Sequence, residues 1–311
     1  MTIEEREPEK FGNAHKADFK SIYNQPDPRA YFAALTPLGY QIPQRALPVV
    51  DRVVALSSTT RDADVATTAD DDNDVEPDVV KVLDVCCSYG INAALLRHDV
   101  DLDGLARHYA STPRLSAAEQ TTADKRFFAS LPRRRSEVEV VGLDSAPGAV
   151  SYAVETGLLA AGFAEDLEVS EPSPALRAAL REVSVVVCTG GVGYVSATTF
   201  GRAAACVRDA GRRLWVVSFV LRVFSFEGIA ARLAEEHGLV TERVRGAVFR
   251  QRRFVSGEER TAAVEDVRRR GLDEGGLEAD GWFWAECWVT RPRGAEARMD
   301  DVLGSVGVLR V

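Results

Sequence analysis

The chain has 311 residues, of which 46% are hydrophobic and 27% charged, a composition typical of a globular protein with one large or two small domains. Its formal net charge is −9 and no dense strip of Lys or Arg occurs, which excludes nucleic acid as an expected partner. The longest strongly apolar run, residues 214–221, is too short for a membrane span, and the polar N-terminus does not resemble a signal peptide, so we expect a cytoplasmic protein without a membrane partner.

Residues 1–56 are predicted to form a helical cap in front of the main domain, because two short helix patterns there are broken by Pro37 and Pro43. Residues 57–78 are acidic, rich in Thr and Ala and poor in large apolar side chains, which predicts a flexible loop. The run DDDND within this loop lacks the glycine turn of a calcium-binding loop, so we do not expect a calcium site.

From residue 79 onward, apolar runs alternate with helix patterns. The runs predicted as strands are 79–85, 138–143, 183–188 and 213–220, and the helices that follow them are 91–97, 148–160, 198–210 and 227–236. Fully apolar strands separated by helices predict an α/β fold with a mostly parallel sheet and helices on both faces. Two more strands, 241–254 and 281–292, flank a helix at 258–270, and we expect the last strand to be antiparallel.

The segment VLDVCCSYGINAALL, residues 82–96, reads as a buried strand, a sharp turn and the start of a helix. Such a turn lies at the ligand-binding edge of a parallel sheet, where the amides of the following helix favour a carboxylate or phosphate. Asp144 ends the next strand, where an acidic side chain can bind two ribose hydroxyls. The nicotinamide pattern G-x-G-x-x-G is not met, because Cys86, Ser88 and Ile91 occupy its glycine positions.

The five cysteines are scattered without a C-x-x-C pair, which predicts neither a disulfide framework nor a metal site. Cys86 and Cys87 have no Lys, Arg or His neighbour in the sequence that would lower a thiol pKa. We therefore interpret both as small buried side chains rather than as nucleophiles.

The turn resembles the first motif of class I S-adenosylmethionine-dependent methyltransferases, which reads roughly V-L-D-h-G-C-G-x-G, where h is apolar. This chain has V-L-D-V-C-C-S-Y-G, so Asp84 and Gly90 match, Ser88 is a small replacement and Cys86 is a departure. The resemblance covers residues 79–292. It implies a seven-stranded Rossmann-like sheet with a reversed last strand, and S-adenosyl-L-methionine as the cofactor. We accordingly expect the whole segment 79–311 to be the cofactor-binding domain.

The resemblance also implies positions for the cofactor. An acidic residue at the end of the second strand binds the ribose in such families, and a later acid followed by an apolar residue borders the adenine. The loop TGGVGYV, after the strand at 183–188, would border both methyl donor and acceptor. The cofactor-binding residues expected on this basis are Asp84, Cys86, Ser88, Tyr89, Gly90, Asn92, Asp144, Ser145, Asp166, Leu167, Thr189 and Gly190.

The chain has two insertions that a compact member of the family it resembles would lack. The helical insertion 99–136 begins and ends at the edge away from the ligand, so we interpret it as packing or as a homodimer interface rather than a lid. The insertion 250–281 starts at the ligand edge, where Gln251, Arg252 and Arg253 are expected to roof an acceptor pocket that the cap also lines. Core tyrosines and a solvated basic turn are the alternatives. The substrate-binding candidates are Tyr23, Tyr40, Tyr194, Arg222 and Arg252.

The function expected from this resemblance is methyl transfer from S-adenosylmethionine to a small-molecule acceptor, with oxygen, nitrogen or carbon as the methylated atom. No catalytic residue is assigned, because the four histidines are dispersed along the chain. The sequence CTGGVGY replaces the Asn/Asp-Pro-Pro-aromatic motif of amino-group methylators, and no acidic triad of metal-dependent catechol methylators is evident. The alternatives are a non-methylating, cyclase-like or partner-subunit role on the same fold, and a nicotinamide oxidoreductase.

Overall fold

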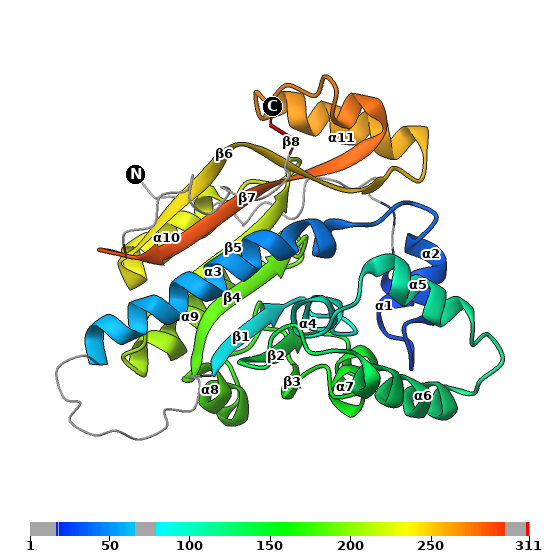
Figure 1. Ribbon diagram of the computed structural model, residues 1–311. Coiled ribbons are helices and arrows are strands. Elements are labelled where there is room, and N and C mark those ends of the chain that lie inside the picture. Colours follow the sequence, from blue (N-terminus) through cyan, green and yellow to red (C-terminus); the bar gives the residue numbers. More distant parts are fainter. Residues whose placement is uncertain (1–16, 18, 66–78, 296–308, 311) are drawn as a thin grey trace.

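An eight-stranded sheet in the order β3-β2-β1-β4-β5-β7-β6-β8 forms the centre of the molecule (Figure 1). The computed structural model describes residues 17, 19–65, 79–295 and 309–310. Strands β1 to β5 pair in parallel, whereas β7 is antiparallel to its neighbours β5 and β6, which confirms the predicted reversed strand. The strands are β1 (Val80–Val85), β2 (Val138–Asp144), β3 (Ala161–Ala164), β4 (Val183–Thr189), β5 (Trp215–Leu221), β6 (Leu239–Arg253), β7 (Trp282–Pro292) and β8 (Leu309–Arg310).

Two edge strands were not part of the sequence prediction. Strand β3 has the sequence AGFA, which is too short and too poor in large apolar residues to produce a strand pattern. Strand β8 has only two residues and pairs antiparallel with β6 at Ala247 and Val248. Both strands take their conformation from the neighbouring strand rather than from their own sequence.

Helices cover both faces of the sheet, because the central strands direct apolar side chains to both sides. One core cluster joins the sheet to α3 (Ile42–Val65), α4 (Ile91–Arg97), α7 (Pro147–Glu155) and α11 (Gly257–Arg269). The other joins it to α8 (Pro174–Leu180), α9 (Ala197–Asp209) and α10 (Glu227–His237). All residues of β5 are buried between these two layers. Within the described ranges, none of the helices is long and apolar enough to cross a membrane.

The N-terminal cap consists of α1 (Lys20–Tyr23), α2 (Arg29–Leu35) and α3, the long blue helix that crosses the sheet in Figure 1. Pro43 does not separate two helices, since it lies in the first turn of α3, where a missing N–H needs no partner. Helix α3 also continues through residues 57–65, which were predicted as loop. Val53, Val54 and Ser57 are buried, so packing extends the helix. The rest of the predicted loop, 66–78, lies outside the described residues.

The helical insertion 99–136 contains α5 (Leu102–Ala110) and α6 (Ala117–Ser130) and packs against the cap. Phe32 of α2 stacks on Tyr109 of α5 with ring centroids 4.7 Å apart. Arg29 Nη1 donates to the carbonyl oxygens of Thr112 and Leu115 at 3.1 and 2.8 Å. The insertion therefore holds the cap from outside, and a homodimer role for it remains a prediction.

Candidate functional site

A cavity of about 460 Å³ opens where β1, β2 and β4 end, between these strand ends and the cap. This is the carboxyl edge of the parallel strands, where α/β sheets bind ligands. The predicted cofactor residues that line it are Cys86, Ser88, Asn92, Asp144, Ser145, Asp166, Leu167, Thr189 and Gly190. The predicted substrate residues that line it are Tyr23, Tyr40, Tyr194 and Arg252. Residues that are far apart in the sequence thus meet at one site.

The turn after β1 keeps the backbone shape of a glycine-rich loop with only one glycine. Cys86, Ser88 and Gly90 all have positive φ, at 59°, 49° and 76°. For a residue with a Cβ this left-handed conformation costs roughly 1–2 kcal/mol. The amides of Cys86 and Cys87 both donate to the carbonyl oxygen of Leu143, at 2.8 and 3.2 Å, which pins the turn to the end of β2.

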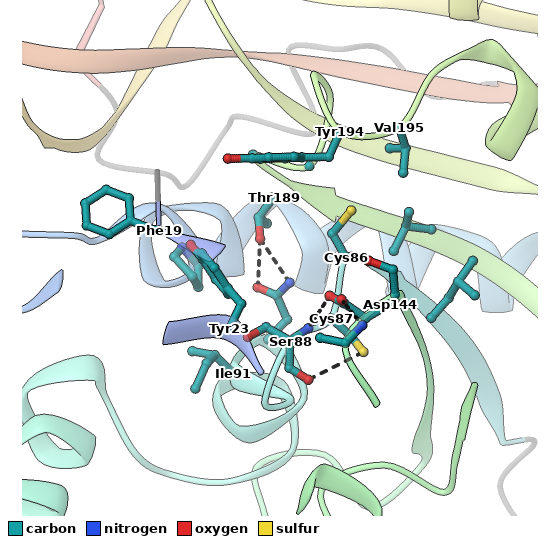
Figure 2. Close-up of a pocket in the computed structure, with 18 of the residues that line it drawn as sticks. Phe19, Tyr23, Cys86, Cys87, Ser88, Ile91, Asp144, Thr189, Tyr194 and Val195 are labelled. Carbon is teal, nitrogen blue, oxygen red and sulfur yellow. Dashed lines mark hydrogen bonds between the residues drawn. The ribbon is translucent and has the colours of Figure 1, made fainter. Parts of the chain in front are cut away.

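Asp144 links the turn to the second strand. Its Oδ2 accepts a hydrogen bond from the Ser88 amide at 2.9 Å and its Oδ1 accepts one from the Ala146 amide at 3.0 Å (Figure 2). Burial raises the pKa of Asp144, and the amides of Ser88, Ala146 and Ser145 oppose that rise. Each carboxylate oxygen keeps a lone pair for a ligand in the cavity.

A second polar group lies beneath the turn. Asn92 Nδ2 donates to Asp84 Oδ1 at 2.8 Å and to Thr189 Oγ1 at 3.0 Å, and so bridges the ends of β1 and β4. Burial raises the pKa of Asp84 to about 7, against the hydrogen bond from Asn92. Two buried atoms, Asp84 Oδ2 and Ser88 Oγ, have no hydrogen-bond partner within the described part of the chain.

The strand order and the place of the cavity decide the fold. The order β3-β2-β1-β4-β5-β7-β6, with β7 alone reversed and the ligand edge at β1, β2 and β4, is the arrangement that the sequence resemblance implies. The chain has the class I methyltransferase fold. No family model and no curated protein matches the chain.

Solved structures that match this methyltransferase fold have low sequence identity. A TehB-like SAM-dependent methyltransferase from Corynebacterium glutamicum is 16% identical, with 75% of this chain and 97% of that chain covered and a TM-score of 0.33. Plantazolicin methyltransferase BpumL, solved with SAH, is 10% identical, with 88% and 93% covered and a TM-score of 0.32. Geranyl diphosphate C-methyltransferase from Streptomyces coelicolor is 11% identical, with 69% and 70% covered and a TM-score of 0.33. The fold assignment rests on the strand order.

Four predicted site residues do not line the cavity, namely Asp84, Tyr89, Gly90 and Arg222. Asp84 lies below it, behind Asn92. Gly90 caps α4 and faces α7, where a Cβ would lie 3.1 Å from the Cβ of Ala153. Tyr89 is fully buried, and its hydroxyl accepts from the Gln25 amide at 2.8 Å and donates to the Ile22 carbonyl oxygen at 2.7 Å. Tyr89 thus fastens the cap to the turn.

Arg222, predicted to bind substrate, is instead part of a buried ion pair away from the cavity. Its Nη1 lies 2.5 Å from Glu278 Oε2, and its Nη2 donates to the Asp273 carbonyl oxygen at 2.5 Å. Glu278 belongs to the short helix η1 (Glu278–Asp280), far along the chain from β5. Arg253 does not line the cavity either, because its guanidinium lies 4.5 Å from the ring centroid of Trp282.

The thiol of Cys86 does not have the properties of a nucleophile. Its hydrogen bond with Cys188 and its burial raise the pKa of Cys86 well above the ordinary value for a thiol. The two sulfur atoms pack against Gly191, where a Cβ would lie 2.8 Å from each of them. Cys86 therefore contributes its backbone and some packing to the turn, and Gly191 is required by this close approach.

The side of the cavity away from Asp144 comes from two distant segments. Tyr23, Tyr31 and Tyr40 belong to the cap, and Gln251 and Arg252 to the end of β6. Backbone hydrogen bonds join the segments, from the Gln41 amide to the Gln251 carbonyl oxygen and from the Arg253 amide to the Leu38 carbonyl oxygen, both at 2.8 Å. Phe19 and Leu35 also line this side and were missed, because the sequence predicted that the cap lines the pocket but not that these apolar side chains of the cap face it.

Proposed function

We propose that the protein binds S-adenosyl-L-methionine in this cavity and transfers its methyl group to a small-molecule acceptor. The observation that carries the proposal is the turn after β1. It has left-handed backbone at the three positions where the resembling motif has glycine, and two of these positions carry side chains. Such strain is maintained where the surrounding structure imposes it, and it concentrates at ligand sites.

The residues around the turn suit the parts of this donor. Asp144 would accept hydrogen bonds from the ribose hydroxyls through its remaining lone pairs, and Asp166 and Leu167 would border the adenine. Ser88 lines the cavity, and its Oγ, which has no partner of its own in the described chain, suits the carboxylate of the methionine part. Asp84 lies below the cavity and would act by holding Asn92 in place. When bound, S-adenosylmethionine supplies an electrophilic methyl group.

The protein's own contribution is alignment and exclusion of water rather than proton transfer. None of the described residues that line the cavity is a histidine. Burial raises the pKa of Tyr23 and Tyr31 well above the ordinary value, and that of Tyr40 to about 12. These hydroxyls stay protonated and do not act as bases, so an acceptor atom that is nucleophilic without losing a proton suits the site.

Two measurements test the proposal. Isothermal titration calorimetry should show binding of S-adenosylhomocysteine and no binding of NADH. Incubation with methyl-labelled S-adenosylmethionine and a metabolite extract should then transfer label to a small molecule. Binding without any transfer would favour a cyclase-like or partner-subunit role, and failure to bind S-adenosylhomocysteine would refute the proposal.

A further inference from the structure

The cavity has two ends, one at β2 and one at β6, and these two strands lie far apart in the strand order of the sheet. Asp144 marks one end on β2, and Gln251 marks the other on β6, with β1, β4, β5 and β7 between these two strands. The carboxamide of Gln251 reaches back to the loop after β4, since a Cβ on Gly190 would lie 2.9 Å from Gln251 Nε2. Gln251 therefore faces the region that the bound methyl group would enter, opposite the ribose side.

Gln251 is buried, and the hydrogen-bonding capacity of its side chain is only partly used. The residue is 6% exposed, and its Oε1 has no hydrogen-bond partner within the described part of the chain. Its carbonyl oxygen is held by the Gln41 amide at 2.8 Å, which fixes the backbone that carries the side chain. An unsatisfied buried amide oxygen costs about 1–3 kcal/mol, a cost that a ligand N–H or O–H would remove.

The charged side chain that lines the cavity beside Gln251 is Arg252, and it has a carboxylate partner. Arg252 is neutralised by Glu259 through two contacts, Nη2 to Oε1 at 2.7 Å and Nη1 to Oε2 at 2.9 Å, and both side chains are almost completely buried. The tyrosines at this end are protonated, and Phe19 and Leu35 are apolar. A charged acceptor would lose its hydration here without gaining an opposite charge.

We propose, on the basis of the proposed methyl transfer, that Gln251 orients the acceptor, which is a small, uncharged aromatic or heteroaromatic molecule that donates an N–H or O–H hydrogen bond to Gln251 Oε1. The rings of Tyr31 and Tyr40 pack edge to face with centroids 6.0 Å apart, and Tyr23 packs on Tyr31 at 5.7 Å, so this wall is aromatic and rigid. A planar acceptor packs on it with little loss of freedom, while Gln251 sets its orientation.

A probe panel tests this inference on the protein saturated with S-adenosylhomocysteine. Indole and phenol are neutral and carry a hydrogen-bond donor, 1-methylindole and anisole lack the donor, and benzoate and benzylamine are charged. Saturation-transfer NMR should rank indole and phenol above their methylated analogues and above both ions. The variant Gln251→Met, similar in size but without the carboxamide, should weaken the binding of indole and phenol about fivefold to tenfold.

Controls separate this inference from folding and from the proposed function. The control Gln25→Met removes a glutamine of the cap that is exposed, and whose side chain donates a hydrogen bond to the Ser21 carbonyl oxygen. This variant should leave probe binding unchanged. Gln251→Glu keeps Oε1, replaces the amide nitrogen with a second oxygen and adds a negative charge, so it should move the preference toward benzylamine. Calorimetry with S-adenosylhomocysteine should give the parent affinity for all three variants.

Several results would overturn the inference. These are equal binding of 1-methylindole and indole, preference of the parent protein for a charged probe, absence of binding by both neutral donors, or unchanged probe binding in Gln251→Met. If the parent protein does not bind S-adenosylhomocysteine at all, the proposed function fails instead. The two failures are therefore distinguishable.

Discussion

The proposed donor side of the cavity, around Asp144, and the proposed acceptor side, around Gln251, are built in different ways. The donor side uses residues at strand ends, with Asp144 ending β2 and Thr189 ending β4, and the contacts of its turn are mainly made by backbone atoms. The acceptor side uses side chains from the cap and from β6, which are more than 200 positions apart in the sequence and joined by two backbone hydrogen bonds. The donor side therefore tolerates Cys and Ser in place of glycine, provided that the backbone shape is kept. The acceptor side depends on which side chains are present.

The largest effect is expected at Asp144. The change Asp144→Ala should weaken S-adenosylhomocysteine binding by roughly 1–3 kcal/mol, or about 5- to 150-fold, because a charged acceptor of ribose hydroxyls is lost and the amides of Ser88 and Ala146 lose their partner. Probe binding on the acceptor side should change much less. Calorimetry on the folded variant measures both, and an unchanged donor affinity would contradict the assignment.

The next largest effect is expected at Asp84, where the free energy of unfolding should depend on pH. Its folded-state pKa, raised to about 7 by burial with a further contribution from Asp144, exceeds the unfolded value, so the fold favours the protonated acid. The stability from this group is complete below about pH 4 and is lost as pH rises to about 7. Relative to the parent, Asp84→Asn should gain on the order of 2 kcal/mol in unfolding free energy between pH 5 and pH 7. Urea denaturation at several pH values checks this, and parallel curves would rule it out.

Tyr89 fastens the cap to the turn after β1, so Tyr89→Phe tests whether the donor side and the acceptor side respond separately. Loss of the hydrogen bonds with Gln25 and Ile22 should lower the free energy of unfolding by about 1–2 kcal/mol. It should also weaken acceptor binding while leaving donor affinity near the parent value, because Tyr89 does not line the cavity. Tyr109→Phe is the matched control, since it removes a buried hydroxyl of the insertion that is bonded to Tyr152 of α7. Equal effects of both variants on acceptor binding would show that Tyr89 has no special connecting role.

Ser88→Gly should give the smallest effect, and in the opposite direction. Glycine relieves the left-handed strain at φ 49° and removes the unpartnered Oγ, but it adds freedom to the unfolded chain. The balance is an expected gain of about 0.5–1 kcal/mol in stability, with a slightly weaker donor affinity from loss of the hydroxyl. Thermal denaturation and calorimetry test the two parts, and a less stable variant would show that the strain argument is wrong.

Sequence patterns predicted which residues lie around the ends of β1, β2 and β4 in the cavity, because apolar runs reveal where buried strands end. Asp144 and Thr189 follow such runs, and parallel order places them at one edge. The direction of Tyr89 was not predictable, since it depends on the left-handed backbone at Ser88. The prediction for Arg222 failed because its partner Glu278 lies 56 positions further along the chain. A basic residue at a strand end looks the same in sequence whether or not such a partner exists.

The acceptor side was predicted only as a general wall. The cap tyrosines and Gln251 lie in segments whose proximity follows from tertiary contacts, such as the ion pair between Arg252 and Glu259 and the backbone bonds from β6 to residues 38 and 41. Long-range packing therefore limits what local patterns reveal here.

The two backbone bonds between the cap and β6 also set an order of events during synthesis. Residues 38 and 41 leave the ribosome long before residues 251 and 253, their partners. Until then, buried side chains of the cap such as Tyr31, Phe32 and Leu35 cannot complete their native surroundings. The nascent chain carries this apolar surface through most of translation, so the acceptor pocket is among the last parts of the molecule to form.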